Sequence, residues 1–334
     1  MKRFLLIVAL GVFCYEVSAQ YIPNSGQAFQ FASAYNPAFT GVENYGDLKL
    51  GYRYQWTGFK EYAPKFVNLA YNFRLKQPLD LTFNALRSSQ SGSKGRIVIP
   101  KSKQLIHGLG FAVFNEKVGL IERLGGGVNY SLHYPLSAKT RMALGVSAIV
   151  ENTKLNADEI YLGANPDPDP FYENLLKGST NHTEVGLRAG ILFYSQNFYF
   201  GASYFPVWNT TIKSSDLDFK DPFYRGSVQA GVSLPVNAEL SIKPSIVALL
   251  QMNDEILIDY NVKAFLEKKV WFGLTYRDIQ SGIVSAGPMI NDKFAASYSY
   301  EFSMSKIKQF SGGSHELVLS VRLNNFKRLS QQTW

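Results

Sequence analysis

The chain has 334 residues, of which 46% are hydrophobic, 14% aromatic and 18% charged, with a single cysteine. The charged fraction is below the roughly 25% typical of soluble domains, and the abundance of Tyr and Phe argues against a disordered chain. A mean hydropathy of −0.10 is too low for a bundle of apolar membrane helices. The net charge of +8 is spread along the whole chain, so we expect no nucleic-acid partner.

The first residues have the organisation of a secretory signal peptide. Lys2-Arg3 precede an apolar run that extends to Phe13, and small residues lead up to Ala19. We expect residues 1–19 to be removed by cleavage after Ala19. Cys14 follows the bulky Phe13, which does not suit lipoprotein processing, so the mature chain would contain no cysteine. Disulfides, thiol catalysis and cysteine-ligated metals would then be excluded together.

Apolar residues occupy every second position over segments of about ten residues, which is the period of a β-strand with one apolar face. In the segment 256–266, for example, Ile256, Ile258 and Val262 share one face and Lys263 lies on the other. About fourteen such segments start near residues 47, 65, 105, 122, 139, 183, 197, 225, 238, 255, 269, 282, 293 and 314.

An even number of strands of about ten residues, each with one apolar face, is the pattern of a bacterial outer-membrane barrel. In hydrocarbon, every backbone N–H and C=O needs a hydrogen-bond partner within the protein. Only a closed sheet has no free edge with unpaired groups. A soluble periplasmic β-sandwich is the alternative. The polar opposite faces, and aromatic residues such as Tyr52, Tyr134 and Tyr300 at the ends of the apolar ones, favour the barrel. We predict an all-β transmembrane barrel of about 14 antiparallel strands, surrounded by lipid bilayer and lipopolysaccharide.

The lengths of the connections predict how the barrel is oriented, because such barrels have short periplasmic turns and longer outer loops. Both termini then face the periplasm, with a periplasmic N-terminal segment at 20–46 and the barrel at 47–334. The long outer loops are predicted at 153–182 and 206–223. Residues 76–104 form a long connection where a short turn is expected, so either the strand register is wrong there or the segment is an insertion or plug.

Catalytic and metal-binding motifs are not apparent in the sequence. The four histidines are far apart, and there is no HExxH pair, nucleophile elbow or phosphate-binding loop. The acidic stretch 165–170 alternates with proline, which favours a stiff surface loop over a calcium site. We expect no enzyme activity, no cofactor and no bound metal.

Charges of both signs lie on the predicted inward rows of the strands. They could define an ion pathway, but pairing across the lumen is favoured because acids and bases both occur. These predicted lumen charges are Arg53, Glu151, Arg188, Asp259, Lys263, Arg277, Glu301 and Arg322.

Three stretches carry a resemblance to a known family. They are Tyr35-Asn36-Pro37-Ala38-Phe39-Thr40-Gly41, Arg53-Tyr54-Gln55-Trp56-Thr57-Gly58-Phe59 and Gly312-Gly313-Ser314-His315-Glu316-Leu317. In this order and spacing, the chain resembles the PorP/SprF family of Bacteroidetes outer-membrane proteins, which is associated with type IX secretion and gliding motility. The residues that carry the resemblance are Asn36, Pro37, Phe39, Gly41, Arg53, Gln55, Trp56, Gly313, His315 and Glu316.

The resemblance implies a non-enzymatic barrel that works with the type IX machinery. Some family members are core components that associate with the periplasmic ring, and others help to secrete one exported adhesin or hold it at the surface. The competing interpretation is a channel for small hydrophobic molecules similar to the FadL family, which also has about fourteen strands and an Asn-Pro-Ala plug. Its fatty-acid site needs an apolar cavity, and the polar inward rows of this chain count against it.

The predicted outer loops contain apolar residues that strand packing does not need. Such residues either cap the barrel or contact a partner, and aromatic residues are enriched at protein interfaces. With the resemblance, they predict binding of the C-terminal domain of a secreted surface protein. The residues concerned are Tyr161, Phe171, Tyr172, Leu175, Leu176, Trp208, Phe219, Phe223 and Tyr224.

Overall fold

The structure, a computed structural model, describes residues 25–75, 105–137, 139–156, 180–213, 224–251, 256–267, 269–278, 281–291 and 293–323. Its strands are β1 (Gly46–Tyr54), β2 (Lys65–Arg74), β3 (Ile106–Val118), β4 (Ile121–Pro135), β5 (Arg141–Leu155), β6 (Asn181–Tyr194), β7 (Phe198–Lys213), β8 (Tyr224–Val232), β9 (Leu234–Pro235), β10 (Leu240–Gln251), β11 (Ile256–Leu266), β12 (Val270–Arg277), β13 (Ser281–Pro288), β14 (Phe294–Ser303) and β15 (Ser314–Leu323). Its short helices are η1 (Ala28–Phe31), α2 (Ala32–Tyr35), η2 (Pro37–Phe39), η3 (Thr57–Tyr62) and α4 (Lys308–Ser311).

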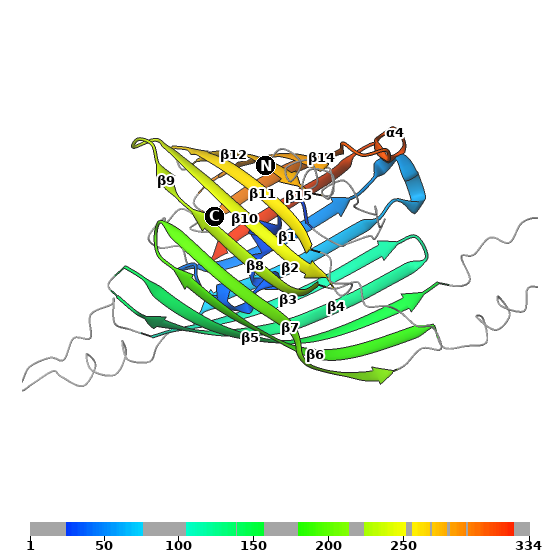
Figure 1. The fold of residues 1–334 in the computed structure, drawn as a ribbon, viewed down its shortest axis with the longest axis horizontal. Coiled ribbons are helices and arrows are strands. Elements are labelled where there is room, and N and C mark those ends of the chain that lie inside the picture. Colours follow the sequence, from blue (N-terminus) through cyan, green and yellow to red (C-terminus); the bar gives the residue numbers. More distant parts are fainter. Residues whose placement is uncertain are drawn as a thin grey trace, which may run out of the picture.

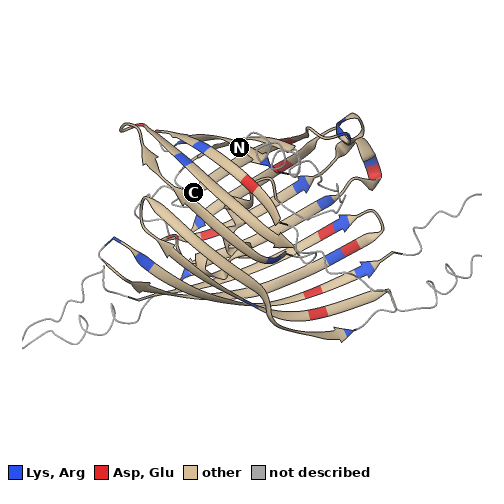
Figure 2. Cartoon of the chain, viewed as in Figure 1, with Lys and Arg blue, Asp and Glu red and all other residues tan. Residues whose placement is uncertain are grey.

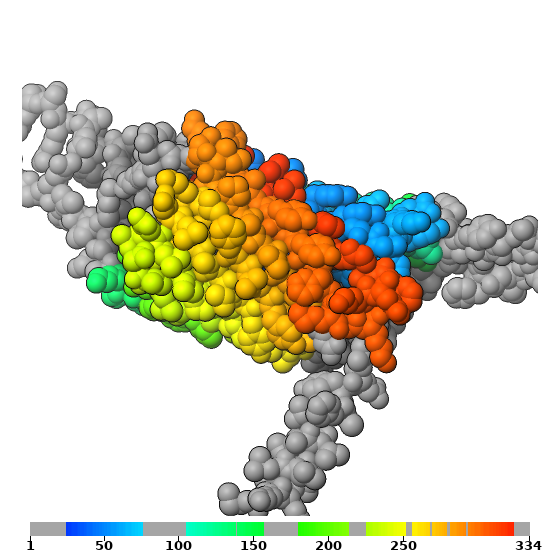
Figure 3. Space-filling model, turned by 90° about the horizontal axis from the view of Figure 1, so that it is seen from above, coloured from blue at the N-terminus to red at the C-terminus, as the bar shows by residue number. Residues whose placement is uncertain are grey.

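The strands form one closed antiparallel barrel (Figure 1). The first strand pairs with the last, with Gly46 opposite Leu323, and the blue and red ends of the sheet meet in Figure 3. β8 and β9 both pair with β10, so the two-residue β9 continues β8, and the fifteen strands make a fourteen-stranded wall. The prediction of a closed barrel with about 14 antiparallel strands is confirmed.

The predicted strand starts lie within two residues of the observed ones, apart from the short β9. One boundary was wrong: the outer loop predicted at 206–223 begins too early, because β7 continues to Lys213. Trp208 therefore lies on a strand and not in a free loop. Tyr224 is the first residue of β8. The predicted insertion at 76–104 lies outside the described residues.

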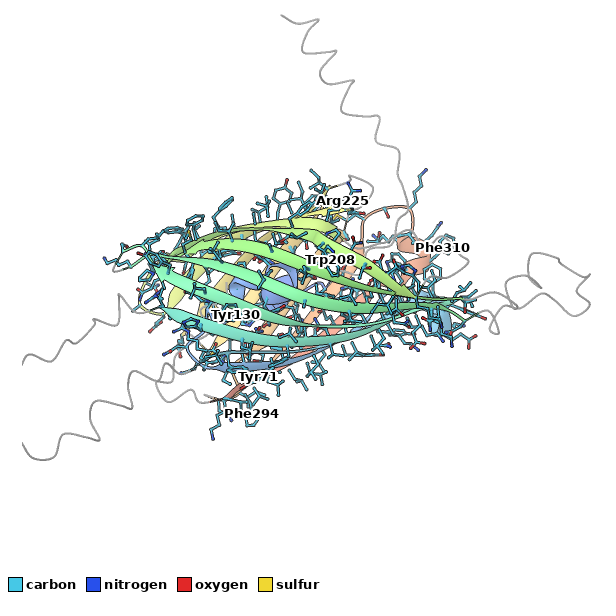
Figure 4. The ribbon with its side chains drawn as sticks, turned by 90° about the horizontal axis from the view of Figure 1, so that it is seen from below. Tyr71, Tyr130, Trp208, Arg225, Phe294 and Phe310 are labelled. Carbon is cyan, nitrogen blue, oxygen red and sulfur yellow. The ribbon has the colours of Figure 1, made fainter. Side chains whose placement is uncertain are left out.

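The two faces of the wall follow the alternation seen in the sequence. On β5, Leu144 and Val146 are about half exposed on the outside, whereas Ala143 and Ser147 are buried. Figure 4 shows side chains projecting from the outer surface of the strands, including those of Tyr130 and Trp208. None of the helices in the described ranges is long and apolar enough to cross a membrane.

The two ends of the barrel differ in their connections. Gly46 and Leu323 lie at the end that carries the tight turns at 136–140, 195–197 and 267–269. We refer to this end as the short-turn end. The opposite end carries η3 and α4, and the links between β5 and β6 and between β7 and β8 begin there. We refer to it as the long-link end.

The N-terminal segment lies inside the barrel, which differs from the expectation of a separate periplasmic segment at 20–46. Residues 25–45, called the plug from here on, contain η1, α2 and η2 and are enclosed by the strands (Figure 1, dark blue). Phe31, Asn36 and Ala38 are almost fully buried. The plug starts near the long-link end, where Gly26 contacts Glu316, and it reaches the short-turn end at the start of β1. The polar inner wall is thus covered by protein.

Candidate functional site

The central turn of the plug, residues 36–41, is built around the Asn36 side chain. Its Oδ1 accepts a hydrogen bond from the Ala38 N–H at 3.0 Å and so caps the short helix η2, which Pro37 begins. Its Nδ2 donates to the backbone oxygens of Ile191 at 3.1 Å and Ala202 at 3.2 Å, on β6 and β7. One buried amide therefore shapes the turn and ties it to the wall.

The wall opposite this turn contains three glycines that leave space for it. A Cβ on Gly145 would lie 2.3 Å from the backbone nitrogen of Ala38, and one on Gly190 would lie 2.1 Å from Asn36 Oδ1. A Cβ on Gly201 would lie 2.9 Å from Asn36 Nδ2. Real Cβ atoms essentially never come this close, so a side chain at Gly145 would displace the plug backbone, and one at Gly190 or Gly201 would displace the Asn36 amide.

The end of the turn is held by backbone carbonyl groups of the plug. The Thr40 oxygen accepts a hydrogen bond from the buried His133 Nε2 at 2.8 Å, and the Gly41 oxygen accepts one from Arg74 Nε at 2.7 Å. Gly41 has φ +74°, and a Cβ there would lie 2.7 Å from the Gly108 Cα. A side chain at position 41 would therefore meet both a conformational and a steric penalty.

The N-terminal end of the plug is held by the Glu316 carboxylate. Glu316 Oε2 accepts a hydrogen bond from the Gly26 N–H at 2.6 Å, and the Ser25 hydroxyl donates to the other carboxylate oxygen. Arg53, opposite Glu316 in the β1–β15 register, approaches Glu316 at 3.5 Å and Glu301 at 2.8 Å. The Arg53 Nε also donates to Gln55 at 3.2 Å.

Arg277 completes this charged group, which we call the clamp (Arg53, Asp259, Arg277, Glu301 and Glu316). Its guanidinium donates two parallel hydrogen bonds to Asp259, at 2.7 and 2.8 Å, and a third to Glu301 at 3.3 Å. Its Nη2 also reaches the Ser25 oxygen at 3.3 Å. All five side chains are less than a tenth exposed, so these are buried pairs in which each charge depends on its partners.

The remaining predicted lumen charges are buried in different settings. Lys263 lies 3.4 Å above the ring of Phe29 in the plug, and Arg322 lies 5.7 Å from the ring of Tyr45. The Lys263 ammonium and the Arg322 guanidinium have no hydrogen-bond partner among the described residues. Arg188 donates to the Ala34 oxygen in the plug, and Glu151 lines the same cavity in the lumen. The clamp charges pair with one another along the wall, on strands between β11 and β1, whereas Lys263 and Arg322 contact aromatic rings of the plug. Figure 2 shows residues of both charge signs on the strands.

The second and third sequence motifs meet at the long-link end. The Trp56 N–H donates to Ser314 Oγ at 3.2 Å, and the Thr57 N–H donates to the Gly313 oxygen at 2.9 Å. A Cβ on Gly58 would lie 2.0 Å from the Phe310 oxygen, so η3 and α4 pack backbone to backbone. His315 is different: it lies on the outer wall, 2.6 Å from the Tyr298 hydroxyl.

The packing of η3 against α4 leaves four apolar side chains exposed, and we call this surface the platform (Phe59, Tyr62, Met304 and Phe310). Phe59 and Tyr62 of η3 are 40% and 68% exposed, and Met304 and Phe310 are 51% and 62% exposed. Phe310 is labelled at the end of the barrel in Figure 4. Of the partner-binding residues predicted from the sequence, Trp208 is half exposed on β7. The others in the predicted loops lie outside the described residues: Tyr161, Phe171, Tyr172, Leu175, Leu176, Phe219 and Phe223.

Comparison with known proteins identifies the family. The profile of the type IX secretion system membrane protein PorP/SprF matches residues 17–321, which is nearly the whole chain. The chain belongs to the PorP/SprF family. A β-barrel of this secretion-system family is an outer-membrane protein, as predicted. No curated protein matches the chain.

This PorP/SprF protein also has a distant likeness to solved outer-membrane barrels. The toluene transporter TbuX of Ralstonia pickettii is 13% identical, with a TM-score of 0.48 over 92% of this chain and 96% of that one. The toluene transporter TodX of Pseudomonas putida is 10% identical, with a TM-score of 0.46 over 92% of this chain and 95% of that one. Omp33 of Acinetobacter baumannii is 11% identical, with a TM-score of 0.45 over 85% of this chain and 100% of that one. Similarity this low carries no argument about function.

In this PorP/SprF protein, most of the motif residues attach the plug or build the platform. Sequence reasoning missed their counterparts on the wall: Gly145, Gly190, Gly201, Arg74 and His133. The glycines carried a signal, because they interrupt otherwise regular inward rows. Among the described residues, no group of three His, Cys, Asp or Glu side chains could hold a metal ion.

Proposed function

We propose that this PorP/SprF protein binds an exported surface protein at the long-link end and retains it at the cell surface. Family membership supports the coarser statement that it is a barrel of the type IX secretion system without an enzymatic role. The observation that supports binding of an exported protein is the platform, where apolar side chains are exposed on elements that lie beyond the strands. The short-turn end is then periplasmic, and other secretion components would contact the barrel there.

The composition of the platform supports a protein partner. Exposed aromatic side chains and Met are enriched at interfaces, because they bury a large area for few rotatable bonds. Phe59, Tyr62 and Phe310 supply the aromatic rings. Lys60 and Lys308 are exposed beside them, so the apolar groups have a charged rim. This arrangement of an apolar centre and polar rim is typical of a binding surface.

The seated plug supports binding in preference to conduction. Its turn and its N-terminal end are both tied to the wall by hydrogen bonds, which reach β2, β6 and β15. A FadL-like channel would need this path to open. Movement of the plug would break the hydrogen bonds of Ser25 and Gly26 to Glu316 and of Ser25 to Arg277, and would expose the buried clamp.

The predicted partner is the C-terminal domain of a secreted adhesin or other surface protein. The loops expected to contact it are the links between β5 and β6 and between β7 and β8, which connect strands whose ends lie at the long-link end. β5 ends at Leu155 and β6 begins at Asn181. β7 ends at Lys213 and β8 begins at Tyr224. The platform and these loops would together form the surface that holds the partner.

The test is recovery of exported proteins from solubilised outer membranes with the intact barrel. The double variant Tyr62→Ser/Phe310→Ser removes two platform rings, and deletion of 160–178 shortens the first loop. The matched control, Tyr134→Ser/Phe294→Ser, removes two exposed rings near the short-turn end. We expect both platform and loop variants to lose the exported protein and the control to keep it, with all barrels folded. Recovery of no exported protein by the intact barrel would contradict the proposal, as would unchanged recovery by both variants.

A further inference from the structure

The lumen contains a cavity of about 90 Å³ between the plug and the wall formed by β2 to β7. Its floor is the end of α2, at Ala34 and Tyr35. Most of the atoms that line it are apolar, although the inward rows around it are mainly polar. The apolar lining comes from Phe66, Ala112, Phe114, Ile149 and Phe205.

Aromatic rings and bare backbone shape this cavity. The rings of Phe66 and Phe114 lie with centroids 6.2 Å apart. Gly126 and Gly127 on the neighbouring β4 present no side chain to the cavity, and a Cβ on Gly125 would lie 2.4 Å from the Phe114 ring. The consecutive glycines of β4 therefore leave space beside the Phe66 and Phe114 rings.

Two of the polar groups at the cavity edge are already engaged by the plug. Asn129 Nδ2 donates to the Ser33 oxygen at 3.2 Å, and Arg188 donates to the Ala34 oxygen. Arg188 also lies 5.1 Å from the Phe205 ring. Asn68, Ser147 and Glu151 also line the cavity, but most of its exposed lining is apolar. Because a water in a cavity needs two to four polar partners, this lining favours an apolar occupant.

The cavity lies on the long-link side of the plug. Phe66 is the second residue of β2, directly after the platform link, and Phe114 is in the last half of β3. Glu151, also at the cavity, is near the end of β5. A molecule would therefore enter from the long-link end, and the plug would stop it from passing further.

We infer that this cavity binds one small apolar molecule whose buried part is no larger than a single hydrocarbon ring. An apolar cavity of about 150 Å³ in another protein is known to stay dry and to bind benzene or xenon. The site in this protein is smaller, so it holds the ring end of a ligand. This inference is independent of the proposed partner, since the cavity lies within the barrel and the platform lies beyond the strands.

The test uses xenon and benzene as probes on the purified full-length protein. Xenon should give a single density peak among Phe66, Phe114 and Ile149 in pressurised crystals, and benzene should raise the Tm. Ala112→Leu fills the space and should remove both responses. Val113→Leu makes a similar change one residue along, on the lipid-facing side, and should leave both intact.

A second variant keeps the test decisive if Ala112→Leu fails to fold. Ile149→Ala enlarges the cavity and should increase xenon occupancy and the benzene-induced shift in Tm. Absence of xenon from the wild-type cavity would overturn the inference, and so would equal responses of the wild type and a folded Ala112→Leu or Ile149→Ala. Loss of exported-protein recovery in the platform variants would leave the xenon result unchanged, so the two proposals fail separately.

Discussion

The N-terminal end of the plug and its central turn are attached to the same wall by different interactions. At the N-terminal end, Gly26 and Ser25 are held by Glu316, within a clamp of five buried charges. At the central turn, neutral groups of Asn36 and Ala38 fit against glycines. The first attachment depends on every charge keeping its partner, and the second depends on shape.

This difference predicts how each attachment fails. Removal of one partner from a buried ion pair leaves an uncompensated charge, and this usually costs about 3–5 kcal/mol. Overpacking at a close contact usually costs about 1–3 kcal/mol because neighbouring atoms can shift a little. Loss of a neutral helix cap costs about 0.5–2 kcal/mol. Variants at the two attachments should therefore fall in that order.

Arg277→Met should have the largest effect. It leaves Asp259 and Glu301 buried with the loss of three hydrogen bonds, and we expect a loss of about 3–5 kcal/mol in the free energy of unfolding. Urea titration of the barrel in lipid vesicles measures this loss in the free energy of unfolding. Lys269→Met is the control, since this lysine is exposed on a turn and its ion pair with Glu267 contributes little. Equal stabilities of the two variants would show that the buried pairs of the clamp do not stabilise the barrel.

Gly145→Val tests the attachment by shape. The new side chain would overlap Ala38, so the turn must leave the wall, and we expect a loss of about 1–3 kcal/mol together with faster proteolysis of residues 25–45. Leu144→Val, one residue earlier and facing lipid, controls for a change to valine on the same strand. Protection of residues 25–45 from proteolysis in Gly145→Val would contradict the close contact between the turn and Gly145.

Asn36→Ala removes the cap of η2 and two hydrogen bonds to the wall. We expect a loss of about 0.5–2 kcal/mol in the same titration, because neutral hydrogen bonds contribute less than buried charge pairs. Asn36→Asp keeps the oxygen that caps the helix but places a buried carboxylate against the Ile191 and Ala202 oxygens. It should therefore lose more stability than Asn36→Ala, because a buried charge without a counter-charge is costly. A loss in Asn36→Ala that matches Arg277→Met would remove the distinction between the two attachments.

Sequence reasoning predicted the wall better than the plug, for a physical reason. The bilayer requires apolar residues at every second position, so the strands of Val146 and Val262 could be located within two residues. Residues 25–45 have no such period, and their contacts with Gly145 and Glu316 join positions far apart in the chain. The motif residues Arg53 and Glu316 were singled out, but their pairing depends on the β1–β15 register, which closes the barrel.

Lys263→Met should have the smallest effect, although Lys263 is as deeply buried as Arg277. Its ammonium has no hydrogen-bond partner among the described residues, and Lys243 lies directly opposite it in the β10–β11 register. The favourable contact is the Phe29 ring at 3.4 Å, and a cation–π contact contributes about 0.5–2 kcal/mol. Desolvation of an ammonium group costs several kcal/mol, so its removal offsets the lost ring contact.

We therefore expect the free energy of unfolding of Lys263→Met to be unchanged or higher at pH 7, measured by the same urea titration. Methionine keeps the length of the side chain and its packing on Phe29 without the charge. Arg277→Met is the matched comparison, since both variants replace a buried cation by the same residue. If Lys263→Met loses as much as Arg277→Met, Lys263 has a counter-charge in the folded barrel, and the contrast between paired and unpaired lumen cations does not hold.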